Sequence, residues 1–80
     1  MPDDLKLCNL SPREMEVALG IAGGKTVAEM AAEMTLCFET VKFHIRKLRD
    51  KTGLRRSVQL AVWASERQAA LRGALRKAGK

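Results

Sequence analysis

Lys42 and Arg46, near the middle of the chain, have side chains suited to recognising a negatively charged partner, and Phe43 lies beside them in the sequence. Lysine and arginine carry permanently charged hydrogen-bond donors, and arginine can donate two parallel bonds to phosphate or to the acceptor edge of guanine. An exposed phenylalanine forgoes about 1.5–3 kcal/mol of burial, part of which it could recover against a thymine methyl group. The alternative is two solvated bases beside a lone exposed hydrophobic residue, which is common on protein surfaces.

These three residues share one side of a predicted helix, from about Phe38 to Thr52, which Gly53 ends. Val41, Ile45 and Leu48 follow the i, i+4, i+7 spacing of a helical stripe, and Thr52 continues it. The apolar stripe is predicted to face the core, so the basic side faces away from it.

Charge is distributed unevenly along the 80 residues, whose formal net charge is +6. Met1 to Leu36 contain six acids and three bases, whereas Cys37 to Arg56 contain seven bases and two acids. Ser57 to Lys80 add five bases and one acid. A one-sided excess of this kind favours a polyanion partner, nucleic acid above all, over a merely solvated helix face.

Other chemistries are poorly supported. Cys8, Cys37 and His44 are too few and too widely spaced for a zinc site, and no nucleophile–base pair or carboxylate pair emerges. We therefore expect no enzymatic activity, no metal and no cofactor. The N-terminus does not look like a signal peptide and no apolar run is long enough to span a bilayer, so we expect a cytoplasmic protein.

The elements that would position the basic helix are also predicted to be helical. Eighty residues allow one domain with a thin core, and a composition rich in Ala, Leu and Met with few aromatics favours helices over a sheet. Ser11 and Glu14 form a capping box that begins a first helix, which residues 23–24 end. Thr26 and Glu29 form a second box before a short second helix.

Ser57 is predicted to cap a fourth helix that begins at Val58 and continues without a firm break to about Lys77. It carries two stripes of small and apolar residues. The stripe predicted to face the core is Val58, Ala61, Val62 and Ser65, and the stripe predicted to contact a partner helix in a homodimer is Leu60, Trp63, Ala64, Arg67 and Leu71. Further contact with the N-terminal arm is the alternative for the second stripe.

The second and third helices, joined by residues 35–37, form a helix-turn-helix pattern, which any helical bundle could also contain. More specific are Ser11–Glu14 (SPRE), Gly24–Thr26 (GKT), Thr40–His44 (TVKFH), and Gly53–Leu54 followed by Arg55–Ser57. With these, the chain from Leu10 to about Glu66 closely resembles the DNA-binding domain of the LuxR family of transcription regulators. Two departures are Thr35, where the family usually has glycine, and Cys37, where it usually has a Ser or Thr cap.

The resemblance implies an all-α, four-helix domain that binds DNA as a dimer through its last helix and reads bases with its third. The implied division is an arm at 1–9, the helix-turn-helix domain at 10–67, and a basic extension of the last helix at 68–80. The predicted base contacts are Thr40, Lys42, Phe43 and Arg46, and the predicted phosphate contacts are Lys25, Thr26, Lys47, Lys51, Arg55 and Arg56. Thr40 has first-turn capping as its alternative.

Three polar residues near the core are predicted to be structural. Glu14 is expected to pair with a base or with backbone N–H groups. His44 is expected to be packed and hydrogen-bonded, and Cys37 is expected to be buried.

The function predicted is a sequence-specific DNA-binding transcription regulator that acts on double-stranded DNA, with itself as dimer partner and RNA polymerase or another regulator as a further candidate partner. One alternative is a helical module that binds and blocks a sigma factor or another regulator. A second is an RNA-binding or nucleoid-coating protein with little sequence preference. No receiver or signal-binding domain is recognised, so we expect a stand-alone regulator or the output domain of a larger one.

Overall fold

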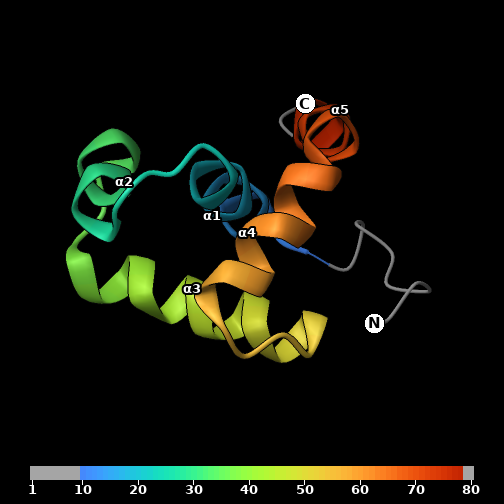
Figure 1. Ribbon diagram of the computed structural model, residues 1–80. Coiled ribbons are helices and arrows are strands. Elements are labelled where there is room, and N and C mark those ends of the chain that lie inside the picture. The colour runs from blue at the N-terminus through green and yellow to red at the C-terminus, as the bar shows by residue number, and fades with distance from the viewer. Residues whose placement is uncertain (1–9, 79–80) are drawn as a thin grey trace.

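The computed structural model describes residues 10–78, which form five α-helices and no strand within that range. The helices are α1 (Pro12–Ala22), α2 (Val27–Met34), α3 (Phe38–Thr52), α4 (Ser57–Glu66) and α5 (Gln68–Ala78). Figure 1 shows α1 in the middle of the molecule, with α2 on one side, α5 on the other and α3 running below. The predicted all-α class is confirmed, whereas the predicted arm at residues 1–9 lies outside the described residues.

Both predicted capping boxes are present. The Ser11 hydroxyl accepts from the Glu14 N–H at 3.2 Å, and the Ser11 N–H donates to the Glu14 carboxylate at 2.9 Å. Thr26 and Glu29 form the same reciprocal pair, at 3.1 and 2.8 Å. Each box satisfies helix N-terminal N–H groups that would otherwise lack partners, and it thereby fixes where α1 and α2 begin.

The turn between α2 and α3 depends on a threonine in an unusual conformation. Thr35 is left-handed, with φ 55° and ψ 44°, and the Leu36 N–H donates to the Ala31 carbonyl at 3.0 Å. A branched side chain is rare at this φ, where glycine would be unstrained. The chain turns sharply here, so that α3 starts only three residues after α2 ends.

The core is built around α1, which packs against α3, α4 and α5. Val17 and Ala18 of α1 are fully buried, as are Val41 and Leu48 of α3. Gly20 lies against α2, because an added Cβ there would come within 2.5 Å of the Met30 sulfur. The predicted inward stripe of α3 is therefore confirmed, and its basic side faces outward.

The prediction of one continuous helix from Val58 to Lys77 is wrong. The chain breaks at Arg67, with φ −116° and ψ 20°, and α5 turns back to pack on α1 (Figure 1). A straight helix from residue 58 to residue 77 would be about 30 Å long. Helix α1, against which it would pack, has only 11 residues and is therefore too short to bury its whole length. The break allows Leu71 to be fully buried. Residues 68–78 are thus a separate packed helix and not an extension of α4.

The two faces of α4 are also reversed relative to the prediction. Leu60, Trp63 and Ala64, predicted for a dimer partner, are buried to 1% exposure or less, as is Leu71 of α5. On the stripe predicted for the core, Val58 is 66% exposed and Val62 is 53% exposed, and Ser65 is exposed too. The large Leu and Trp side chains fill more of the core than valines would, so their burial decides the rotation of the helix.

Candidate nucleic-acid interface

The outer face of α3, which we define as Lys42, Phe43, Arg46 and Lys47, is exposed along its whole length. Phe43 is 51% exposed and makes an edge-to-face contact with His44, with 5.8 Å between ring centroids. The Lys47 ammonium lies 5.6 Å from the Phe43 ring centroid. Cation–π contact keeps this lysine beside the ring, so apolar and cationic groups share one surface. Three of the four predicted base-contact residues belong to this face.

Thr40, the fourth predicted base contact, lies beside this face in the first turn of α3. Its hydroxyl is 3.0 Å from the Cys37 sulfur, and the residue is only partly exposed. Cys37 is the N-cap but makes no side-chain capping bond, and it is exposed, so the prediction that it is buried is wrong. Hydrogen bonds from the Thr40 hydroxyl and the Thr40 N–H lower the pKa of the Cys37 thiol.

Phe38 extends the aromatic character of this surface, and sequence reasoning gave it no role. It is 48% exposed, and the Lys42 ammonium lies 5.6 Å from its ring centroid. It also lines a hollow of about 350 Å³ between α2 and α3, together with Val27, Lys42, Ile45, Arg46 and Arg49. The i, i+4 spacing of Phe38 and Lys42 was the available signal, since residues so spaced are neighbours on a helix.

Two of the predicted phosphate contacts, Lys25 and Thr26, lie at the start of α2, and both already have acidic partners within the protein. The exposed Lys25 ammonium pairs with the Glu33 carboxylate, and the Thr26 N–H is held by Glu29 at 2.8 Å. The helix dipole and the Lys25 charge still favour an anion here. A phosphate would have to compete with Glu33 for the Lys25 ammonium.

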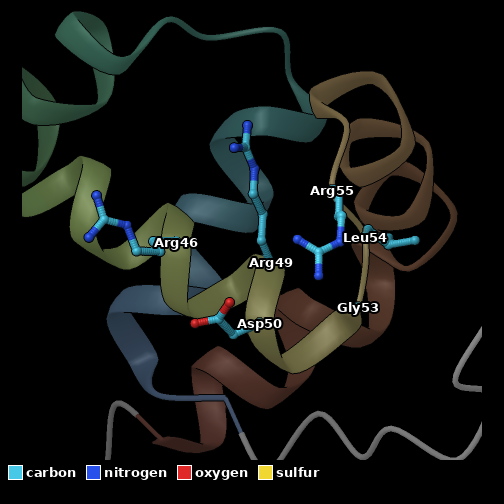
Figure 2. A pocket seen from close by; sticks show the side chains of 6 residues that line it. All are labelled: Arg46, Arg49, Asp50, Gly53, Leu54 and Arg55. Carbon is cyan, nitrogen blue, oxygen red and sulfur yellow. The ribbon is translucent and has the colours of Figure 1, made fainter.

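The joint between α3 and α4 carries two further exposed arginines. Arg55 and Arg56 are exposed, as predicted, and the Arg56 N–H donates to the Gln59 side chain at 3.5 Å. Arg49 was not singled out from the sequence. Its guanidinium reaches across the joint and donates to the Ser57 hydroxyl at 2.8 Å. Arg49 and Arg55 also line a second hollow, drawn in Figure 2.

Lys51 pairs with a buried acid, in contrast to the bases on the outer face. Its ammonium is 2.7 Å from the Glu14 carboxylate, whose side chain is only 7% exposed. Burial raises the pKa of Glu14, but the hydrogen bond from Lys51, the Ser11 N–H and the charges of Lys51 and His44 together lower this pKa below its ordinary value. The structural role predicted for Glu14 is confirmed. The pair ties α1 to α3, the helix that carries the outer face.

Two negative observations concern residues 10–78 only. They contain no group of three or more His, Cys, Asp or Glu side chains able to hold a metal ion. No helix among them is long and apolar enough to cross a membrane.

A short capped helix, a tight turn, and a helix with a buried apolar stripe and an exposed basic face together define a helix-turn-helix domain, a class of DNA-binding fold. A comparison with protein families agrees with this class: residues 8–64 match the family described as bacterial regulatory proteins, luxR family. The chain belongs to this family, whose domain is that of DNA-binding transcription regulators. The searches of curated proteins and of solved structures gave no match.

Proposed function

We propose that the protein is a sequence-specific DNA-binding transcription regulator that inserts α3 into the major groove as a homodimer. The observation that carries this proposal is the outer face of α3, where exposed cations and an exposed phenylalanine lie opposite a fully buried Val41 and Leu48. The major groove of B-DNA is wide enough for one α-helix. A helix anchored on one side by the core can place its other side against base edges.

Three residues of the outer face supply the sequence preference. Arg46 donates to the O6 and N7 of a guanine, and Lys42, one turn earlier, reaches an acceptor on a neighbouring base or phosphate. The Phe43 ring, 51% exposed, contacts a thymine methyl group. Thr40 has its hydroxyl beside the Cys37 sulfur, and so it contacts a base or phosphate only at the edge of the groove.

Phosphate contacts fix the position of the domain on the duplex without reading sequence. They come from the start of α2, from the outer face and from the α3–α4 joint, and the residues are Lys25, Thr26, Lys47, Arg55 and Arg56. We leave Lys51 out of this set, because it pairs with the Glu14 carboxylate, which is only 7% exposed, whereas the Glu33 partner of Lys25 is 55% exposed and can be replaced by a phosphate.

The homodimer uses the valine face of α4, which we define as Val58 and Val62. Both are more than half exposed, although valine is usually buried. Two copies that pack these faces together form an isologous interface. Such a dimer would bind a two-fold symmetric site whose half-sites lie about one helical turn apart.

A binding-site selection from random duplexes, repeated at two salt concentrations, tests this function. A regulator of this kind enriches a two-fold motif at both concentrations, whereas purely electrostatic binding weakens with salt and enriches nothing. Enrichment of no motif would contradict sequence-specific recognition. It would favour a nucleoid-coating role if binding is nevertheless tight at low salt.

Phe43→Ala in the same selection tests the thymine contact. Removing the ring should relax the preference at one A·T position in each half-site and leave the other positions unchanged. Arg76→Ala, which shortens an exposed side chain of α5 outside the proposed DNA and dimer contacts, is the control. An unaltered motif with Phe43→Ala would assign the ring another role.

A further inference from the structure

The α3–α4 joint contains a hollow of about 310 Å³ that borders the outer face of α3 at Arg46. Its lining residues are Arg46, Arg49, Asp50, Gly53, Leu54 and Arg55, and we call it the arginine hollow. Three guanidinium groups and one carboxylate give it an excess of positive charge. Figure 2 shows Arg46 pointing away from the joint, while the Arg55 guanidinium turns toward the Arg49 side chain.

Arg49 is held in place before any ligand arrives. Its terminal nitrogen donates to Ser57 at the first position of α4, at 2.8 Å. A guanidinium has five N–H donors, so this bond leaves most of them for other acceptors. The Arg49 Nε is shielded from solvent and has no hydrogen-bond partner within residues 10–78. A pre-positioned cation with unused donors loses little side-chain entropy when an anion binds.

Arg55 approaches the same hollow from the connection that follows Gly53. Gly53 is left-handed, with φ 74°, and it turns the chain so that Leu54 is partly buried and Arg55 is exposed beside Arg49. Asp50 is the one acid lining the hollow, and it is exposed. Its charge offsets part of the attraction and so limits how tightly an anion binds.

We propose that the arginine hollow binds one phosphodiester group of the DNA backbone, with Arg49 and Arg55 as its two cationic ligands. This inference rests on the proposed function, and it adds Arg49, a residue outside the predicted contacts. A phosphate fits better than a base here, because a guanidinium group can donate two parallel hydrogen bonds to the oxygens of one tetrahedral anion, and Arg49 and Arg55 line the same hollow. Arg46 lies between the hollow and the outer face, so the bound phosphate fixes how far along the groove Arg46 reaches.

The test is a methylphosphonate scan, in which each phosphate of the selected site is replaced in turn by an uncharged analogue. With the wild-type chain, one replacement in each half-site should lower affinity about tenfold, the size expected for losing a charge-assisted hydrogen bond. With the double variant Arg49→Gln/Arg55→Gln, the same replacement should cost nothing further. The affinity of this variant for unmodified DNA should also depend less on salt, with a slope smaller by about 0.9 for each phosphate lost.

Arg76→Gln on α5 is the matched control, because Arg76 is exposed and lies outside the hollow. It changes the overall charge but should leave the scan unaltered. Ser57→Ala gives a second variant that keeps every charge and releases Arg49. It should reduce the cost of the same methylphosphonate replacement without abolishing it. Circular dichroism and a urea titration establish that each variant is folded.

The outcomes separate this inference from the proposed function. Suppose that the wild type selects a motif and that every methylphosphonate replacement costs the double variant as much affinity as it costs the wild type. The proposed phosphate site is then wrong, and the proposed function is unaffected. If the wild type selects no motif, the salt slope on random duplex still decides. A slope reduced by the double variant and not by Arg76→Gln supports a phosphate site on a protein without sequence preference, and an unchanged slope overturns it. Saturable binding of inorganic phosphate with no effect on the scan would assign the hollow to a free anion and would also overturn it.

Discussion

Helices α3 and α4 are both amphipathic, yet their outward faces differ in chemistry. The outer face of α3 is cationic, and the exposed face of α4 is valine. In α3, a single apolar stripe lies opposite a charged face, so only one rotation of the helix about its axis buries the stripe without also burying charge. In α4, two apolar stripes compete, and side-chain size decides which one is buried. The outward face of α3 therefore suits a polyanion, whereas that of α4 suits a second protein surface.

The largest expected effect tests which face of α4 belongs to the core. Leu60→Ala should lower the free energy of unfolding by about 2–5 kcal/mol, because it removes a buried side chain and leaves a cavity. Val62→Ala, at an exposed site, should change it by no more than about 0.5 kcal/mol. Urea titrations measure both, and similar losses for the two variants would reverse the assignment of the faces.

The same pair of sites distinguishes folding from association. Val62→Asp should keep the monomer folded and abolish dimers on DNA, because it places a charge in an apolar interface. Leu60→Asp should instead unfold the chain. Ala69→Asp, which places the same charge at an exposed position of α5, is the control. Sedimentation of the DNA complexes measures the change, and dimers that survive Val62→Asp would exclude the valine face as the interface.

The contrast between α3 and α4 also explains what sequence alone can predict. The starts of α1 and α2 were predictable, because Ser11–Glu14 and Thr26–Glu29 are local signals that work through neighbouring N–H groups. The inward stripe of α3 was predictable for the same reason, since charge marks its other side. The break at Arg67 was not, because no Gly or Pro marks it and its cause is the burial of Leu71 against α1, far away in sequence. The bond from Arg49 to Ser57 likewise depends on where the α3–α4 joint places the first residue of α4.

The ion pairs of Lys51 and Lys25 provide the next comparison, because the acid is buried in the first pair and exposed in the second. Glu14→Gln should lower the free energy of unfolding at pH 7 by about 1.5–3 kcal/mol, because it removes a charged acceptor from a partly buried pair with Lys51. Glu33→Gln removes the carboxylate from an exposed pair with Lys25, whose side chains are 43% and 55% exposed, and should cost less than about 1 kcal/mol. Urea titrations of both variants measure the difference. Equal losses in the free energy of unfolding would mean that the Glu14–Lys51 pair stabilises the fold no more than the exposed Lys25–Glu33 pair does.

The pH dependence of the wild type gives the sign of the same effect. The pKa of Glu14 is lowered in the folded chain, so the unfolded chain binds its proton more readily. The stabilisation is therefore complete above the ordinary value of 4.5 and disappears as the pH falls through the lower, folded-state pKa. The difference in unfolding free energy between wild type and Glu14→Gln should shrink over that range. A difference that grows toward acid pH would show that the carboxylate is not stabilised by Lys51.

The outward cations should affect binding and not stability. Arg46→Ala and Lys42→Ala should each weaken binding to the selected site by about 1–3 kcal/mol, because each removes a donor from a base edge or phosphate. Both residues are exposed, so the unfolding free energy should stay within about 0.5 kcal/mol of wild type. Arg76→Ala on α5 controls for net charge. Fluorescence anisotropy at fixed salt measures affinity. Unchanged affinity in both variants would contradict the proposal that α3 binds in the major groove.

The two ends of α3 give the smallest expected effect and show how this helix is held. Thr35 before it and Gly53 after it are both left-handed, with φ 55° and 74°. Thr35→Gly should raise the free energy of unfolding by about 0.5–1 kcal/mol, because relief of the left-handed strain exceeds the entropy that glycine adds to the unfolded chain. Gly53→Ala should lower it by a similar amount, since an added Cβ meets no atom within 4 Å and only the backbone is strained. Thr35→Ala, which keeps the strain, is the control. If Thr35→Gly stabilises the chain but weakens DNA binding, the strained turn also positions α3 for binding. If the variant binds DNA as tightly as the wild type, the strain at Thr35 has no part in binding.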